Sequence, residues 1–238
     1  MQKLKVRNVA ILLFSVLILI AVTYVYGRSI WYPVYSKLRG RQTAQSVVKN
    51  YEAEVEKRLK EPFKKAKLKT FPKNLTFIIL KKERKLEVWT KVGNKNIFIK
   101  NYQMTAFSGK IGPKLQEGDR QIPEGIYKIT FLNPNSSYHL SMRINYPNKF
   151  DKKMAKWEGR KNLGGDIMIH GKAVTIGCIP VGDKGIEELF VLAYKAGIKN
   201  ITVLSSPQDF RINDKIAPNK RQWVNSLYQL LKSKLKEF

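Results

Sequence analysis

The feature that most constrains the fold is the segment of residues 166–181, which reads DIMIHGKAVTIGCIPV. It opens with the apolar run 167–169, which is typical of a short buried strand, and that run ends at His170. Gly177 precedes Cys178, and a glycine there lets the backbone turn sharply or approach another group closely. The spacing therefore predicts a strand, a tight loop and a return, with the imidazole and the thiol facing each other.

These two side chains are candidates for nucleophilic chemistry. Cys178 is the only cysteine of the chain, and His170 is one of two histidines. A thiol attacks carbonyl groups as its thiolate, and a nearby imidazole can take its proton. The backbone N–H groups of Gly177 and Cys178 are then candidate donors to the oxygen of a tetrahedral intermediate. A lone cysteine is, however, more often a small buried hydrophobic residue, so the residue types alone leave both interpretations open.

The HG-x5-GC block at residues 170–178 resembles the active-site motif of the YkuD-type L,D-transpeptidase catalytic domain. Residues 175–178 take the place of the family's [ST]-H-G-C, with Ile176 where histidine is common. Pro180 stands where many members carry arginine or asparagine, and the spacing between histidine and cysteine is short. These departures are similar to the YafK-like branch. Two upstream segments also resemble that branch, residues 116–129 and 133–151.

The resemblance implies a fold that is mainly β with flanking helices (α+β), an L,D-transpeptidase-like β-sandwich. It implies that Cys178 is the nucleophile, His170 the general base and later acid, and Gly177 a backbone donor to the oxyanion. His139 is an alternative base, but His170 is preferred because it lies in the matching HG dipeptide. No metal or organic cofactor is implied. The candidate substrate-binding residues are His139, Arg143, Gly171 and Thr175.

Residues 9–26 are apolar except for Ser15 and Thr23. As a helix this run spans roughly 27 Å, close to the thickness of the hydrocarbon core of a bilayer. A cleaved signal peptide is the alternative, but its apolar core is usually about 7–15 residues long. We expect an uncleaved single-pass anchor in the bacterial inner membrane. The basic tail favours a cytoplasmic N-terminus and a periplasmic catalytic domain, although further basic residues follow the run, namely Arg28, Lys37, Arg39 and Arg41.

Further along the chain, two apolar runs at 75–80 and 85–90 flank a polar turn, which favours a β-rich domain over a doubly wound α/β fold. Helical spacing is expected at 41–61, at 183–196 with Asp183 as the capping residue, and near the end of the chain. The expected organisation is a basic tail (1–8), an anchor (9–26), a helical linker (27–72), a catalytic domain (73–207) and a C-terminal helical extension (208–238).

The charge of the chain points to an anionic partner. Lys and Arg number 45 against 18 Asp and Glu, a formal net charge of +27. No specific nucleic acid is expected, because the sequence has neither zinc-ligand spacing nor an RNA-binding aromatic signature, and its basic residues are spread along the chain. Lipid head groups and peptidoglycan carboxylates fit an anchored domain outside the cytoplasm.

The function implied by the resemblance is a membrane-anchored, cysteine-dependent L,D-transpeptidase that acts on peptidoglycan stem peptides through a Cys178 thioester. One alternative is a hydrolase of the same family, which releases a peptidoglycan-linked lipoprotein or trims stem peptides. Another is a noncatalytic, basic cell-wall-binding module, whose function would not change when Cys178 is replaced by alanine.

Overall fold

The computed structural model describes residues 2–27, 30–32, 34–35 and 40–238. The chain divides into two compact units, Met1–Gln42 and Thr43–Phe238, and each is described by itself. Met1 of the predicted tail and the basic residues Arg28, Lys37 and Arg39 lie outside the described residues.

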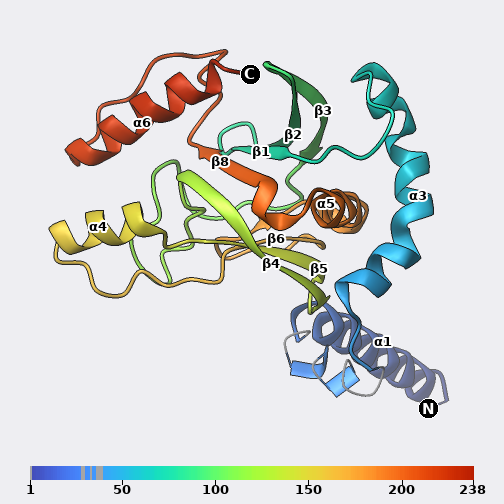
Figure 1. Cartoon of the computed structure of the whole chain (residues 1–238). Helices are drawn as coiled ribbons and strands as arrows, with labels where there is room; N and C mark the ends of the chain where they lie inside the picture. Colours follow the sequence, from blue (N-terminus) through green and yellow to red (C-terminus); the bar gives the residue numbers. More distant parts are fainter. Residues whose placement is uncertain (1, 28–29, 33, 36–39) are drawn as a thin grey trace. The chain divides into compact units, whose positions relative to one another are not determined.

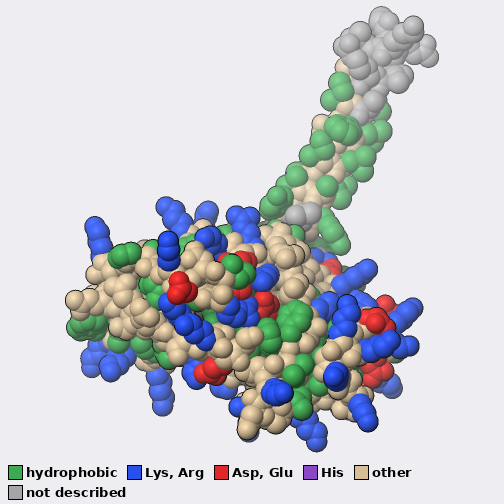
Figure 2. All heavy atoms as spheres, turned by 90° about the horizontal axis from the view of Figure 1, so that it is seen from above, with side chains coloured by type: hydrophobic (Ala, Val, Ile, Leu, Met, Phe, Trp, Pro, Cys, Tyr) green, Lys and Arg blue, Asp and Glu red, His purple; other side chains and the backbone are tan. Residues whose placement is uncertain are grey.

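The first unit contains helix α1 (Gln2–Tyr26), which includes the whole predicted apolar segment. Its described side chains are exposed: Leu12 is 64% and Leu19 65% accessible. Figure 2 shows hydrophobic side chains along this helix. Within the described residues, no helix reaches the combination of length and apolarity that a membrane crossing requires. The anchor therefore remains a prediction.

The second unit is built on an eight-stranded sheet (Figure 1). Its strands follow the order β3-β2-β1-β8-β4-β5-β6-β7. Their bounds are β1 (Leu75–Leu80), β2 (Lys85–Val92), β3 (Lys95–Gln103), β4 (Gly125–Ser136), β5 (His139–Ile144), β6 (Met168–His170), β7 (Ile179–Pro180) and β8 (Ile201–Ser206). Neighbouring strands are antiparallel except for the parallel pairs β1–β8 and β6–β7.

The long strand β4 connects the two halves of the sheet. Its first residues, Gly125–Lys128, pair with β8, whereas from Ile129 onward it pairs with β5. The register with β5 shifts between Ile129 and Phe131, as expected where a strand bends. The predicted α+β class with flanking helices is confirmed. The strands of the predicted β-sandwich form one continuous hydrogen-bonded sheet, because β4 pairs with strands of both halves.

Helices cover both faces of this sheet. They are α3 (Ala44–Lys65), α4 (Lys149–Trp157), α5 (Gly182–Ala196), the short 3-10 helix η1 (Ile198–Asn200) and α6 (Gln222–Leu235). Strand β1 shows why both faces need a cover. Side chains alternate along a strand, so Phe77 and Ile79 enter the core with α3 and α5, whereas Ile78 and Leu80 enter a second core with α6. The continuous apolar run at 75–80 follows from this double burial.

Helix α3 differs from its predicted bounds at both ends. It begins after Thr43, whose hydroxyl accepts from the Ser46 N–H at 3.0 Å, while the Ser46 hydroxyl accepts from the Thr43 N–H at 3.0 Å. This reciprocal capping box sets the start of the helix. The helix continues past Pro62, whose carbonyl still accepts from the Ala66 N–H at 2.9 Å, so proline does not end it.

Candidate active site

The predicted strand, loop and return are present as β6, the loop 171–178 and β7. In the parallel pair, Ile169 lies opposite Ile179 and His170 opposite Pro180. Cys178 directly precedes β7 and therefore lies beside Met168, the first residue of β6. Because side chains alternate between the faces of a sheet, Cys178, Met168 and His170 share one face.

The same face continues onto β5. Arg143 lies opposite Met168, and Ser141 lies opposite His170. Arg143, Met168 and Cys178 thus form one row across three strands, and Ser141 and His170 form the next. The fold therefore brings the predicted nucleophile, the predicted base and one predicted substrate-binding residue to a common surface.

The Cys178 thiol is half-buried at the start of β7. Its Sγ accepts from the Met168 N–H at 3.4 Å and donates to the Asp166 carbonyl oxygen at 3.8 Å. Burial raises the pKa of the Cys178 thiol, and the Met168 N–H and the Lys114 ammonium offset this only in part. At rest the predicted nucleophile is therefore a neutral thiol, which would need a base to react.

His170 is suited to be that base. Its imidazole is 2% exposed, and Nδ1 lies 2.6 Å from the Gly171 carbonyl oxygen. A carbonyl oxygen only accepts, so Nδ1 carries the proton and Nε2 has the free lone pair. Burial lowers the pKa of His170, and the Gly171 carbonyl opposes this shift. The ring is thus neutral near pH 7, as a base must be.

Two further contacts define the setting of His170. The Tyr138 ring lies 4.9 Å from it, centroid to centroid, at a 40° tilt. Among the described residues, the imidazole and the thiol form hydrogen bonds with backbone groups and not with each other. Catalytic hydrogen bonds are often long or poorly aligned until substrate binds.

Thr175 braces the turn that carries the cysteine. Its hydroxyl accepts from the Gly177 N–H at 3.1 Å and donates to the Cys178 carbonyl at 2.8 Å. Gly177 has φ +130°, and a Cβ there would lie 3.1 Å from the Gln121 carbonyl oxygen, so the position requires glycine. The Gly177 N–H is engaged by Thr175 at rest. Its role toward an oxyanion stays a prediction and requires that bond to be exchanged.

Gly171 is packed too tightly for any other residue. A Cβ there would lie 2.7 Å from an Asp183 carboxylate oxygen and 2.8 Å from the Tyr138 carbonyl oxygen. Asp183 accepts from the Lys172 N–H at 3.0 Å and from its ammonium at 2.5 Å. Asp183 therefore orders the loop after His170. The predicted capping role is wrong, because the N-cap residue of α5 is Val181 and no side chain caps the helix.

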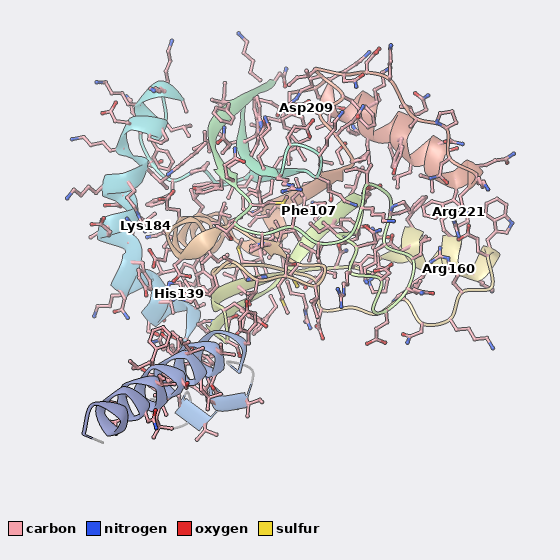
Figure 3. The ribbon with its side chains drawn as sticks, turned by 180° about the vertical axis from the view of Figure 1, so that it is seen from behind. Phe107, His139, Arg160, Lys184, Asp209 and Arg221 are labelled. Atoms are coloured by element: carbon pink, nitrogen blue, oxygen red, sulfur yellow. The ribbon has the colours of Figure 1, made fainter. Side chains whose placement is uncertain are left out.

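His139, labelled in Figure 3, contacts residues of α5 and α3. Its Nε2 is 2.8 Å from Glu187 Oε1 on α5, and its ring meets the Tyr51 ring of α3 edge-on at 5.8 Å. Its neighbour Tyr138 contacts His170 instead. Arg143 is exposed and pairs with Asp166 at 3.3 Å, next to the carbonyl that the thiol contacts. The substrate-binding roles of His139 and Arg143 stay predictions.

A buried cation near the thiol was missed at the level of sequence. Lys114 is 7% exposed, and its ammonium donates to Asp119 Oδ1 at 2.7 Å and to the Gln116 carbonyl at 2.9 Å. The other Asp119 oxygen accepts from the N–H groups of Leu115 and Gln116 at 2.7 and 3.0 Å. The only sign of this ion pair in the sequence was that Lys114 and Asp119 lie five residues apart, in a stretch without helix or strand periodicity.

The state of the thiol leads to a testable pH dependence. Thiolate is the form that iodoacetamide alkylates. Because burial raises the pKa of Cys178, the alkylation rate is expected to rise with a midpoint above that of an ordinary cysteine. Intact-mass measurement across pH reads this position alone, since the chain has one cysteine.

The same chain unfolded in urea is the control, because it exposes the same thiol to water. A folded-state midpoint at or below the unfolded one would mean that a thiolate–imidazolium pair exists at rest, and would contradict the neutral-thiol description.

Comparison with known families places these residues in a broader context. Residues 75–201 match the family described as "YkuD: L,D-transpeptidase catalytic domain", which is more than half of the chain. The matched range includes every strand of the site.

Individual relatives match a smaller part of the chain than the family does. The chain is 36% identical over 114 residues to "Putative L,D-transpeptidase YafK" of Escherichia coli K12, and equally to that of strain O157:H7. The match takes in 47% of this chain and 44% of each relative, so the chain spans less than half the length of these relatives.

Solved structures are also similar. The helical cell shape determining protein Pgp2 from Campylobacter jejuni aligns with a TM-score of 0.48 and 24% identity, over 68% of this chain and 56% of that one. Bd1075 of Bdellovibrio bacteriovorus aligns with a TM-score of 0.43 and 22% identity, over 70% of this chain and 56% of that one.

Proposed function

This chain belongs to the YkuD family of L,D-transpeptidase catalytic domains, and we propose that it is a cysteine-dependent L,D-transpeptidase that acts on peptidoglycan stem peptides. The observation that carries the proposal is the state of His170. Its Nδ1 is bound to the Gly171 carbonyl, which leaves Nε2 as a base on the sheet face that also bears Cys178.

The reaction follows from two neutral partners. As the Cys178 sulfur attacks the acyl carbon of a stem peptide, its proton passes to His170 Nε2. The tetrahedral intermediate then collapses, and the imidazolium returns that proton to the departing amine. A thioester remains on Cys178. An acceptor amine attacks the thioester and gives up a proton to the same imidazole. The C–S bond then breaks, the imidazolium returns the proton to the Cys178 sulfur, and the acyl group leaves in a new amide bond.

Two groups are positioned to assist. The Cys178 N–H, with the Gly177 N–H once it leaves Thr175, is proposed to bind the oxyanion. Arg143 is exposed in the same row as the thiol, and its guanidinium is suited to a substrate carboxylate. That role requires Arg143 to exchange Asp166 for substrate, which is inexpensive because both side chains are exposed.

We further propose that residues 9–26 anchor the protein in the inner membrane and that the catalytic unit works in the periplasm. The support is the length of the apolar run and the exposure of its described side chains, such as Leu13 at 60% and Phe14 at 66%. The proposed substrate also lies outside the inner membrane.

The test is product analysis on purified peptidoglycan, with and without covalently attached lipoprotein. New crosslinks or exchanged terminal residues, together with an acyl adduct on Cys178 in the intact mass, are the expected result. Released lipoprotein, or shortened stem peptides without new bonds, would mean that the protein is a hydrolase with the same nucleophile and not a transpeptidase. Unaltered peptidoglycan and an unmodified Cys178 would contradict the proposal.

A further inference from the structure

Helix α4 presents a dense basic face to solvent. The Lys and Arg side chains visible in Figure 2 are spread widely, as a solvated surface requires. On α4, however, four lysines are exposed within nine residues: Lys149, Lys152, Lys153 and Lys156. At about 100° per residue they occupy one continuous arc of the helix. None of these lysines forms an ion pair with another residue in the described part of the chain.

The acids near this face are directed elsewhere. Asp151 points inward, where its carboxylate accepts from the Asn148 N–H at 2.9 Å and from the Tyr127 hydroxyl at 3.3 Å. Glu158 accepts from the Trp223 indole at 2.9 Å and from Arg160 at 2.7 Å, and it also pairs with Arg221 at 3.0 Å. Figure 3 labels the two arginines near the ends of α4 and α6. The lysine arc therefore keeps its full positive charge.

Aromatic side chains border the arc on one side. Trp157 is 68% exposed. Phe150 lies seven residues earlier, on the same side of the helix, and is 37% exposed. The inner face of α4 is occupied by Met154 and the buried Ala155. The Phe150 ring packs edge-on against Trp223 of α6 at 5.9 Å, whereas the Trp157 ring makes no such contact in the described part of the chain. An exposed tryptophan next to unpaired lysines is unusual for a face that remains in water.

We propose that this face, defined by Lys149, Phe150, Lys152, Lys153, Lys156 and Trp157, docks onto an anionic lipid membrane. Lysine clusters of this size bind the negative surface potential of a bilayer, and tryptophan favours the boundary between head groups and acyl chains. A dissolved polyanion would neutralise the lysines but leave the Trp157 ring in water. A lipid surface accommodates the charges and the rings together. This inference does not depend on the proposed reaction.

The segment Thr43–Phe238 is suited to the test, because both hydrophobic cores lie entirely within it and α1 is absent. Its binding to vesicles of phosphatidylglycerol and phosphatidylethanolamine is compared with binding to phosphatidylcholine vesicles by sedimentation. Changing the four α4 lysines to glutamine is expected to weaken binding to the anionic vesicles about tenfold or more. Trp157→Ala is expected to weaken it as well.

The matched control removes four exposed lysines from α3, namely Lys57, Lys60, Lys64 and Lys65, again to glutamine. That helix carries acids among its lysines, so its variant should bind nearly as the wild type does. Equal losses of vesicle binding in the two lysine variants would mean that net charge alone causes the binding, and would overturn the proposal. Equal binding to both vesicle types, or an unaffected Trp157→Ala variant, would also overturn it. So would α4 lysine variants that bind vesicles normally and lose binding only to peptidoglycan sacculi. Circular dichroism verifies that each variant is folded.

Discussion

Replacing Cys178 by alanine is expected to abolish acyl transfer, with a loss of at least about 10³-fold in rate. The methyl group cannot form a thioester, and no second thiol exists in the chain to replace it. The fold should survive, because the hydrogen bonds of the sulfur within the described residues are long, at 3.4 and 3.8 Å, and the site is half-buried. Product formation from peptidoglycan, with the melting curve alongside, measures both effects.

The two histidines supply a matched comparison for this experiment. His170→Gln should reduce the rate by about 10²–10⁴-fold, the usual contribution of a general base. His139→Gln should leave most of the activity, because His139 contacts Glu187 and Tyr51 and not the thiol. If the Cys178→Ala protein made the same products as the wild type, the noncatalytic wall-binding module would become the better description.

The second large effect is expected in stability, at the ion pair of Lys81 and Glu124. Both side chains are fully buried, with 2.7 Å between Lys81 Nζ and Glu124 Oε1. Lys81 also donates to the carbonyls of Gly112 and Ile122 at 2.6 and 2.9 Å. Glu124 accepts from the Tyr228 hydroxyl of α6 at 2.5 Å. Burial lowers the pKa of Lys81 even though Glu124 opposes the shift.

Lys81→Met is expected to cost about 3–5 kcal/mol in the free energy of unfolding, because it leaves the Glu124 carboxylate buried without its cation. Denaturant unfolding of the Thr43–Phe238 unit measures this. The activity should fall too, since Gly112 and Ile122 belong to the loop whose Gln121 packs on Gly177.

Lys234→Met is the control, because its pair with Glu237 lies on the surface and should change stability much less. A double variant, Lys81→Met with Glu124→Leu, should recover part of the loss by removing the orphaned charge. A single variant as stable as the wild type would mean that the pair does not hold this loop.

The elements that sequence reasoning located correctly are those with a local signature. The run 75–80 became β1, and the HG and GC dipeptides flank the loop between β6 and β7. Strand β3 ends at Gln103. Beyond that point the chain forms the loop that carries Lys114, where contacts distant in sequence decide the conformation.

Asp183 shows at a single residue that local sequence patterns do not specify contacts distant in the chain. An acid at the start of a helical pattern is a reasonable cap, yet its carboxylate turns to Lys172, eleven residues earlier. The position of Lys172 depends on the parallel pairing of β6 with β7, which no local pattern specifies. Likewise, the contact of Tyr138 with His170 depends on the pairing of β5 with β6.

The protonated state of the Cys178 thiol has a consequence for the chemical lifetime of the protein. Oxidation to sulfenic acid proceeds from the thiolate, and so does exchange with disulfides. Because burial raises the pKa of this thiol, peroxide meets little of the reactive anion between catalytic cycles. In the proposed reaction the sulfur becomes strongly nucleophilic only while an acyl donor occupies the surface and His170 takes the proton. A single unpaired cysteine can in this way persist among oxidants and still react quickly with its own substrate.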